Sequence, residues 1–312
     1  GIRQFEEAFL AVWQAKTDDD IFNSLVLSAA MPWRDVALLR AYAAYMKQLK
    51  LGYSQKFIAE TLIQHKHIAE LLIKYFYGLF DPSMEQSQST RLNKRLVSKI
   101  VQLIDGVENL SEDSILRSYH SLITATLRTN YFQKNASDDH KEYLSFKLAP
   151  ELIDGMPLPK PKFEIFVFSP VMEGVHLRGG KIARGGLRWS DRREDYRTEV
   201  LGLVKAQQVK NSVIVPVGAK GGFVIKRPAE EPGRDAFMQH GINCYRLFIQ
   251  GLLDITDNYV DGEIVPPASV VRKDEDDPYL VVAADKGTAT FSDIANGIAS
   301  EYGFWLDDGF AS

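Results

Sequence analysis

The sequence has 312 residues, of which 45% are hydrophobic, and its 37 basic and 41 acidic side chains give a net charge of -4. This length suffices for two domains with buried cores, and the slight acidity argues against a nucleic-acid partner. The single cysteine, Cys244, excludes an internal disulfide bond and is typical of a reducing compartment, so we expect a cytoplasmic protein. No apolar run approaches the roughly 20 residues of a membrane helix, so no membrane partner is expected.

Residues 1–135 are predicted to be almost wholly helical, because apolar residues recur there three and four positions apart. The expected helices are FEEAFLAVWQA, IFNSLVLSAA, VALLRAYAAYMKQLKL, a long one over FIAETLIQHKHIAELLIKYFYGLF, VSKIVQLIDGV and DSILRSYHSLITATLRTNYF. A loop is expected over SMEQSQSTRLNKR. The expected caps or first-turn residues are 18–20, Pro32, Ser54 and Ser111. We interpret this half as a packing scaffold.

Two groups in the helical part do not favour a functional interpretation. His65 and His67 are two positions apart, which points them to different sides of a helix, so no metal pair is expected. Aromatic residues at helical spacing usually belong to a core or a subunit interface. This interpretation covers Tyr42, Tyr45, Tyr75, Phe76, Tyr77 and Phe80.

From about residue 140 the pattern changes to the apolar character of strands. The expected strands are EYLSFKLAP, FEIFVFSP, VHLRGG, SVIVPV and YLVVAAD, with helices over 192–209, 234–255 and a last one capped by Ser292. Strands that alternate with helices indicate an α/β domain with a largely parallel mixed sheet. We therefore predict a mainly α-helical segment over 1–135 and an α/β domain over 136–312. The acidic segments TDNYVDGEIVPP and RKDEDDP are expected to be solvated.

The residues that could carry chemistry gather in one cationic stretch, 174–227. It holds 12 basic and 4 acidic residues, a net charge of +8, so the rest of the chain sums to -12. Arg184 and Lys220 are each followed by two glycines, the first of them Gly185, so both basic side chains sit beside backbone that can approach a ligand closely. Such a segment is expected to gather anions locally.

A clamp for a small dianion is conceivable within this stretch. Gln207 and Lys210 are one helical step apart and share a face of the predicted helix. Lys220 follows the predicted strand SVIVPV, and ligands of α/β sheets bind at the carboxyl ends of strands. If Arg184 converges on the same edge, its guanidinium would suit one carboxylate, and an amide with an ammonium would suit the other. Lys220, next to other cations, is expected to exchange protons near neutral pH.

Asp285 ends the strand VVAAD and is the natural acid–base partner of Lys220. The alternative is that Asp285 caps a turn, as most aspartates at strand ends do, or balances an arginine, and both roles stay open at this stage. GAKGG does not match a Walker loop, because Ser or Thr would have to follow the lysine, and G-x-G-x-x-G occurs nowhere in the sequence. The alternating charges of residues 191–199 are interpreted as a solvated or salt-bridged helix face.

Three runs together resemble the glutamate dehydrogenase family, and specifically its very large NAD-dependent bacterial class. The runs are KIARGGLRWS, EVLGLVKAQQVKNSVIVPVGAKGG and AADKGTATFSDIA, and the similarity covers about residues 110–312. The resemblance implies that Lys220 is the catalytic lysine and that Asp285 is the proton-transferring aspartate. The implied reaction is oxidative deamination of L-glutamate to 2-oxoglutarate and ammonia, with NAD as hydride acceptor.

The same resemblance implies a substrate-binding set of four residues in an α/β substrate domain. Gln207 and Lys210 would hold the substrate α-carboxylate, and Arg184, beside Gly185, would hold the side-chain carboxylate where the small enzymes of the family have a lysine. The family is oligomeric, so a homo-oligomer is expected. Residues that bind the cofactor are not identified, because the family carries them in a nucleotide-binding domain that follows the substrate domain. We expect a fragment that lacks this domain and is inactive alone.

Two alternatives stay open. One is a related amino-acid dehydrogenase with another side-chain specificity, and Arg184 discriminates against it because an apolar substrate would leave its charge without a partner. The other is a non-catalytic module that binds an anion or nucleic acid through the cationic stretch. The few aromatic residues there, Trp189, Tyr196 and Phe223, make a poor stacking platform for bases.

Overall fold

The computed structural model describes residues 1–210 and 217–306, and of Lys210 only the backbone. The chain forms two compact units. The first comprises Gly1–Thr126 with Leu152–Gly155, and the second comprises Leu127–Glu151 with Met156–Ser312. A helical unit is therefore followed by a sheet-containing one, as the sequence predicts. Among the described helices, none combines the length and the apolar character needed to cross a membrane.

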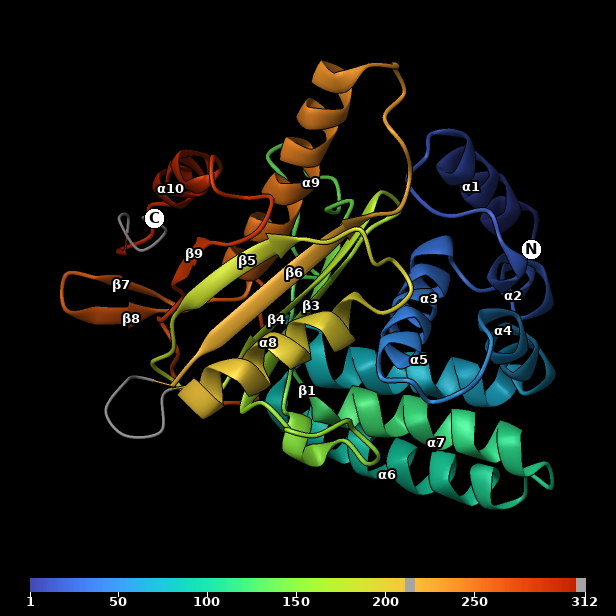
Figure 1. The fold of residues 1–312 in the computed structure, drawn as a ribbon. Helices are drawn as coiled ribbons and strands as arrows, with labels where there is room; N and C mark the ends of the chain where they lie inside the picture. Colours follow the sequence, from blue (N-terminus) through green and yellow to red (C-terminus); the bar gives the residue numbers. More distant parts are fainter. Residues whose placement is uncertain (211–216, 307–312) are drawn as a thin grey trace. The chain divides into compact units, whose positions relative to one another are not determined.

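The first unit is built of helices, drawn from blue to green in Figure 1. They are α1 (Ile2–Trp13), the short 3-10 helix η1 (Ile21–Asn23), α2 (Ser24–Ser28), α3 (Trp33–Gln48), α4 (Gln55–Gln64), α5 (Lys66–Phe80), α6 (Gln86–Asp105) and α7 (Leu110–Ala125). The expected caps at Asp20 and Ser54 are confirmed, since their side chains accept hydrogen bonds from Phe22 N–H and Phe57 N–H. Of the six aromatic residues assigned to the core, five are buried and Tyr77 is partly exposed.

Four predictions for the helical part of the chain are wrong. The helix expected over DSILRSYHSLITATLRTNYF ends at Ala125, where the strand β1 (Thr126–Thr129) begins. The long helix expected over 57–80 is interrupted at His65, whose backbone leaves the helical region and whose ring contacts Glu112 at 2.8 Å. The segment SMEQSQSTRLNKR was expected to be a loop, but most of it is helical and forms the first half of α6. The cap of α7 is Asn109 and not Ser111, because the Asn109 side chain accepts hydrogen bonds from the first backbone N–H groups of the helix.

The second unit contains a seven-stranded sheet of order β1-β2-β3-β4-β6-β5-β9. The strands are β1 (Thr126–Thr129), β2 (Leu144–Leu148), β3 (Phe163–Phe168), β4 (Met172–Arg178), β5 (Gly185–Trp189), β6 (Ala219–Ile225) and β9 (Val282–Ala284). The other elements are the 3-10 helix η2 (Pro150–Leu152), the hairpin β7 (Asn258–Val260) and β8 (Glu263–Val265), and the helices α8 (Tyr196–Lys210), α9 (Arg234–Asp254) and α10 (Ser292–Glu301). Helix α8 covers one face of the sheet, while α9 lies behind the other (Figure 1).

The expected mixed α/β sheet is confirmed. Pairing is antiparallel from β2 through β3 and β4 to β6, and parallel where β5 lies between β6 and β9. Parallel pairing thus occurs in the half of the sheet that carries the candidate site. The predicted strand SVIVPV lies almost wholly outside the described residues. Ser292 is the first residue of α10 and makes no capping hydrogen bond, so that predicted cap is wrong.

The core of this unit lies between the sheet and the pair α9 and α10. Side chains from β3, β5, β6 and β9 pack there against both helices. Trp189 lies between Phe223 and Phe237, with ring centroids 5.9 and 5.2 Å away and nearly parallel planes. Cys244 is buried in the same core, and burial raises the pKa of its thiol to about 12. The cysteine therefore acts as an apolar core residue, as expected from the sequence.

The acidic segment RKDEDDP, expected to be solvated, instead supplies part of a buried ion network. Arg128 of β1 forms two hydrogen bonds to the Asp257 carboxylate, at 2.8 and 3.0 Å, and a third to Asp274 at 2.7 Å. Lys147 of β2 contacts Asp274 and Asp277, and Arg178 of β4 also pairs with Asp277. Basic side chains buried on strands must be compensated by carboxylates, and RKDEDDP provides two of the three. The third, Asp257, comes from TDNYVDGEIVPP, so the prediction that this segment is solvated is also wrong for that residue.

Removal of one partner from this network is expected to be strongly destabilising. Asp257→Ala leaves the buried Arg128 guanidinium without its two-bonded partner, at a cost of about 3–5 kcal/mol in the free energy of unfolding. Chemical denaturation measures this difference. Glu301→Ala is the matched control, because it breaks an exposed ion pair with Arg246 and should cost about 1 kcal/mol or less. Equal stabilities of the two variants would contradict the account.

Acid is expected to weaken the same network. Burial raises the pKa of Asp277, but Arg178 and Lys147 outweigh it and lower this pKa to about 2. A carboxyl group whose folded pKa is depressed stabilises the fold above its unfolded pKa of about 3.9, and this contribution is lost as the pH falls toward 2. Asp277→Asn should therefore lower the melting temperature at pH 7 and flatten its decline between pH 4 and pH 2. An unchanged slope would exclude Asp277 as a source of the acid sensitivity.

Candidate active site

Lys220 and Asp285 form an ion pair on the α8 side of the sheet. The Lys220 ammonium nitrogen lies 3.1 Å from Asp285 Oδ2, and the two side chains are 22% and 15% exposed. Lys220 is the second residue of β6, so the prediction that it lies past the end of a strand is wrong. Asp285 directly follows β9, as predicted. Parallel strands bring together two residues that are 65 positions apart in the sequence.

Asp285 is held by several donors at once. Its Oδ1 atom accepts hydrogen bonds from Arg188 at 3.2 Å and from the Lys286 N–H at 2.7 Å. Its own N–H donates to Thr288 Oγ1, so it also starts a turn. Partial burial raises the pKa of Asp285, but the hydrogen bonds from Lys286, Lys220 and Arg188 outweigh it and hold this pKa below its usual value. Asp285 therefore starts a turn and balances an arginine, while its role in proton transfer stays a prediction.

A line of charges continues from Arg188, a residue of β5 that sequence reasoning missed. Arg188 lies 4.0 Å from Glu199 of α8, and Glu199 lies 3.8 Å from Arg192. The predicted salt-bridged face is confirmed for Arg192, which also pairs with Asp195. It is wrong for Arg197, which is buried against Glu164 of β3. The available signal for Arg188 was a charged residue in the otherwise apolar strand GGLRW, since such a residue needs a partner.

The predicted substrate-binding residues meet in part at the start of β5. Arg184 is exposed, and its backbone oxygen accepts hydrogen bonds from Ala219 N–H at 3.1 Å and from Gln207 Nε2 at 3.5 Å. Gln207 Oε1 is buried and has no hydrogen-bond partner among the described residues. The Lys210 side chain lies outside the described part of the chain. The structure therefore brings Gln207 and the Arg184 backbone together, close to Gly185.

The two glycines after Arg184 are required by the packing of β5. A Cβ atom on Gly185 would lie 1.6 Å from the Ala219 carbonyl oxygen of β6, which is backbone and cannot rotate away. A Cβ atom on Gly186 would lie 2.8 Å from Asp285 Cβ. Because neither position carries a side chain, β5 can approach both neighbouring strands closely. This approach sets the distance between Lys220 and Asp285.

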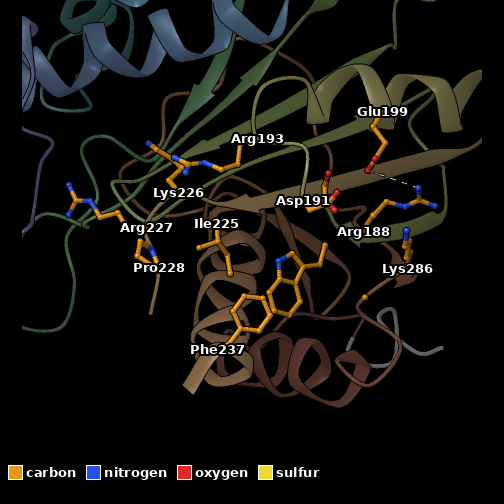
Figure 2. A pocket seen from close by; sticks show the side chains of 13 residues that line it. Arg188, Asp191, Arg193, Glu199, Ile225, Lys226, Arg227, Pro228, Phe237 and Lys286 are labelled. Atoms are coloured by element: carbon orange, nitrogen blue, oxygen red, sulfur yellow. Dashed lines mark ion pairs between the residues drawn. The ribbon is translucent and has the colours of Figure 1, made fainter. Parts of the chain in front are cut away.

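A pocket of about 490 Å³ opens at the carboxyl ends of β5 and β6, and Lys286, the residue after Asp285, is part of its lining (Figure 2). Its size falls within the range of about 300–1,000 Å³ that is usual for small-molecule sites. Figure 2 shows Arg188 and Lys286 on one side of it and Phe237 and Ile225 on another. Its charged lining comprises Arg188, Arg193, Lys226, Arg227, Lys286, Asp191 and Glu199. Five cations against two carboxylates suit an anionic ligand. The described residues contain no cluster of three or more metal-binding side chains.

Comparison with known proteins identifies the family to which this geometry belongs. A family model described as bacterial NAD-glutamate dehydrogenase, catalytic domain, matches residues 99–312. The chain belongs to this family. A second model, glutamate dehydrogenase, helical motif 3, matches residues 17–82 within the helical unit. Both Lys220 and Asp285 lie within the part of the chain matched by the catalytic-domain model.

Curated relatives are similar over nearly the whole chain. The NAD-specific glutamate dehydrogenase of Halomonas elongata is 58% identical over 99% of this chain, and that of Pseudomonas aeruginosa is 59% identical over 98% of it. The enzyme of the same name from Mycobacterium tuberculosis is 53% identical over 99% of this chain. The matched region makes up 19% of the first two relatives and 20% of the third, so the chain spans about a fifth of their length.

Gly185→Ala is expected to disrupt the candidate site through the backbone. The new methyl group overlaps the Ala219 carbonyl, so β5 must shift, at a cost of about 1–3 kcal/mol in the free energy of unfolding. Gly202→Ala on α8 is the matched control, because a Cβ atom there meets nothing within 4 Å. This control should be stabilising by about 0.5–1 kcal/mol, since alanine favours a helix interior. Thermal or chemical denaturation distinguishes the expected loss of stability in Gly185→Ala from the expected gain in Gly202→Ala. An unchanged stability of Gly185→Ala would contradict the packing argument.

Proposed function

We propose that this chain forms the substrate-binding part of an enzyme that converts L-glutamate to 2-oxoglutarate and ammonia, with NAD as hydride acceptor. The ion pair between Lys220 and Asp285 is the observation that supports this proposal most directly. It places an amine and a carboxylate 3.1 Å apart, partly shielded from water, in the region matched by the catalytic-domain model. The names of the relatives agree with the proposed reaction.

The proposed chemistry needs groups that move protons. Oxidation of glutamate at Cα gives an iminium, which must add water and then release ammonia. In the proposal Lys220 takes a proton from the attacking water, and Asp285 moves protons to and from the departing nitrogen. The contact between the two side chains allows a proton to pass directly from one to the other. Partial burial strengthens their electrostatic effect on a bound substrate.

Recognition of glutamate is proposed for the start of β5 and the end of α8. The substrate and the product each carry two carboxylates, and Arg184 is exposed for one of them. Gln207, whose side-chain amide lies beside the Arg184 backbone, and Lys210 would hold the other. Gln207 Oε1, which has no hydrogen-bond partner among the described residues, would accept a hydrogen bond from the substrate ammonium. Gly185 would leave room for the substrate beside the strand.

In the proposed reaction, NAD would be the hydride acceptor. The connections from β5 to α8, from β6 to α9 and from β9 to α10 carry no G-x-G-x-x-G sequence, which is the usual means of holding a dinucleotide pyrophosphate at a helix N-terminus. The described residues therefore do not build a dinucleotide site of that kind. No residue of this chain is assigned to NAD, and the roles above concern the substrate alone.

The proposal extends to a cytoplasmic homo-oligomer that takes part in glutamate catabolism. A lone buried thiol at Cys244 suits a reducing compartment. Helix α1 exposes large apolar side chains, among them Ile2, Phe9 and Trp13, which a further copy of the chain would cover.

Substitution of the two proton-transferring residues should nearly abolish turnover. Lys220→Met and Asp285→Asn remove a general base or acid while preserving size, and we expect kcat for glutamate-dependent NAD reduction to fall by about 10²–10⁴. Arg184→Ala should mainly raise KM for glutamate. The assay follows NADH absorbance in the native protein, with Lys205→Met, an exposed change on α8, as the control. Retention of more than a tenth of the activity by Lys220→Met or Asp285→Asn would refute the assignment.

A further inference from the structure

We infer that Arg188 is a positioning residue that fixes the orientation and the charge of the Asp285 carboxylate, and that Glu199 limits the strength of this hold. The inference concerns the regulation of Asp285 and rests on the proposed function only for its consequence in turnover. Arg188 acts through Asp285 and is assigned no contact with the substrate. Neither Arg188 nor Glu199 was singled out by the sequence as part of the site.

The carboxylate of Asp285 is divided between two cations. Lys220 approaches Oδ2 at 3.1 Å and Arg188 approaches Oδ1 at 3.2 Å, where the Lys286 N–H also donates. Rotation of the carboxylate would therefore break contacts at both oxygens. If Lys220 moves to serve a substrate, Arg188 still holds the other oxygen in place. This arrangement separates the task of orienting Asp285 from the task of exchanging protons with it.

The hold exerted by Arg188 is weaker than a two-bonded pair would be. One terminal nitrogen contacts Asp285, while the other lies 4.0 Å from Glu199 Oε1. The Arg188 Nε atom and Glu199 Oε1 are both buried without a hydrogen-bond partner in the described part of the chain. Arg128, by contrast, binds Asp257 through two hydrogen bonds. Arg188 is thus shared between two carboxylates and fully satisfies neither.

Glu199 competes with Asp285 for the same guanidinium. It lies on α8, and its other oxygen is 3.8 Å from Arg192, so it belongs to the line of charges that leads away from the site. Because Glu199 neutralises part of the Arg188 charge, it reduces the attraction that keeps Asp285 ionised. A group that must both accept and release protons needs such a balance, since a carboxylate held too firmly would not accept a proton.

The charged groups that face Asp285 come from four places. Lys220 extends from β6, Arg188 from β5, Glu199 from α8 through Arg188, and Lys286 follows Asp285 in its own turn. The hydrogen bonds from Lys286 N–H, Lys220 and Arg188 act to lower the pKa of Asp285, against the effect of burial. Loss of the Arg188 charge should therefore raise this pKa, and loss of the Glu199 charge should lower it.

Nuclear magnetic resonance of the 312-residue chain, labelled with ¹³C at the aspartate carboxyl carbons, tests these opposite effects on the pKa of Asp285 without any assay of activity. The Asp285 signal is assigned by its loss in Asp285→Asn. We expect Arg188→Gln to raise the titration midpoint of Asp285 by about one pH unit. Glu199→Gln should lower it by a few tenths of a unit, roughly as expected for a charge acting from one residue away. Lys205→Gln, the loss of an exposed cation on α8, is the control and should leave it unchanged.

An Asp285 midpoint that moves in the same direction in both variants, or that stays fixed in Arg188→Gln, would overturn the inference. Should Arg188→Gln fail to fold, two other variants still test the inference. Arg188→Lys is expected to raise the titration midpoint of Asp285, and Glu199→Gln is expected to lower it.

Kinetics of the native protein provide the second readout. Arg188→Gln should move the acidic limb of the kcat/KM profile to higher pH, with Arg188→Lys closer to the wild type, while KM for glutamate changes by less than about threefold. A wild-type protein without glutamate-dependent NAD reduction would refute the proposed function and leave the titration result standing. An active enzyme in which Arg188→Gln leaves the limb in place would refute the positioning role alone.

Discussion

Close approach of β5 to its two neighbours is the constraint on which the candidate site depends. Side chains at Gly185 and Gly186 would collide with Ala219 of β6 and with the segment after β9. Only because these positions lack side chains can the strands pair in parallel at this spacing. The pairing then brings together Lys220 of β6, Arg188 of β5 and Asp285, which directly follows β9. Backbone packing therefore determines the electrostatics of the site.

Two ion networks in the same unit differ in a way that matches their tasks. At the centre of the first network Arg128 and Asp257 are fully buried and joined by two hydrogen bonds, so loss of Asp257 deprives a buried guanidinium of its two-bonded partner. The network around Asp285 is partly exposed, and its ion pairs are single and longer. Within the described ranges, two of its polar atoms have no hydrogen-bond partner. The first arrangement suits a fixed connection between strands. The second leaves room for a substrate to alter the contacts.

Periodicity in the sequence was sufficient to predict the α/β sheet and most helices, whereas the dehydrogenase site residues were proposed from the resemblance to the family. It failed where the outcome depended on contacts between distant parts of the chain. No proline or glycine in the sequence indicates the helix break at His65. The polar start of α6 lacks the apolar repeat from which a helix is predicted. The acidic segment around Asp274 was misjudged because the partners of Asp274, Arg128 and Lys147, lie more than a hundred positions earlier. Such pairings cannot be found by local pattern.

The candidate site shows the same limit. Lys220 and Asp285 could be named from motifs, but their contact follows from strand pairing across 65 positions. Arg188 is 97 positions from Asp285, and nothing in GGLRW itself indicates which acid it contacts. Lys210 could be placed on a helix next to Gln207 by spacing alone, whereas its contribution to substrate binding stays a prediction.

A crystal structure of the protein with bound 2-oxoglutarate would test the central claim most directly. The account predicts that the ligand lies on the α8 side of β5 and β6, with one carboxylate at Arg184 and the other at Gln207 or Lys210. Its keto carbon should lie next to Lys220 and Asp285. A ligand bound only in the pocket at the carboxyl ends of the strands, without contact to Lys220, would contradict the account.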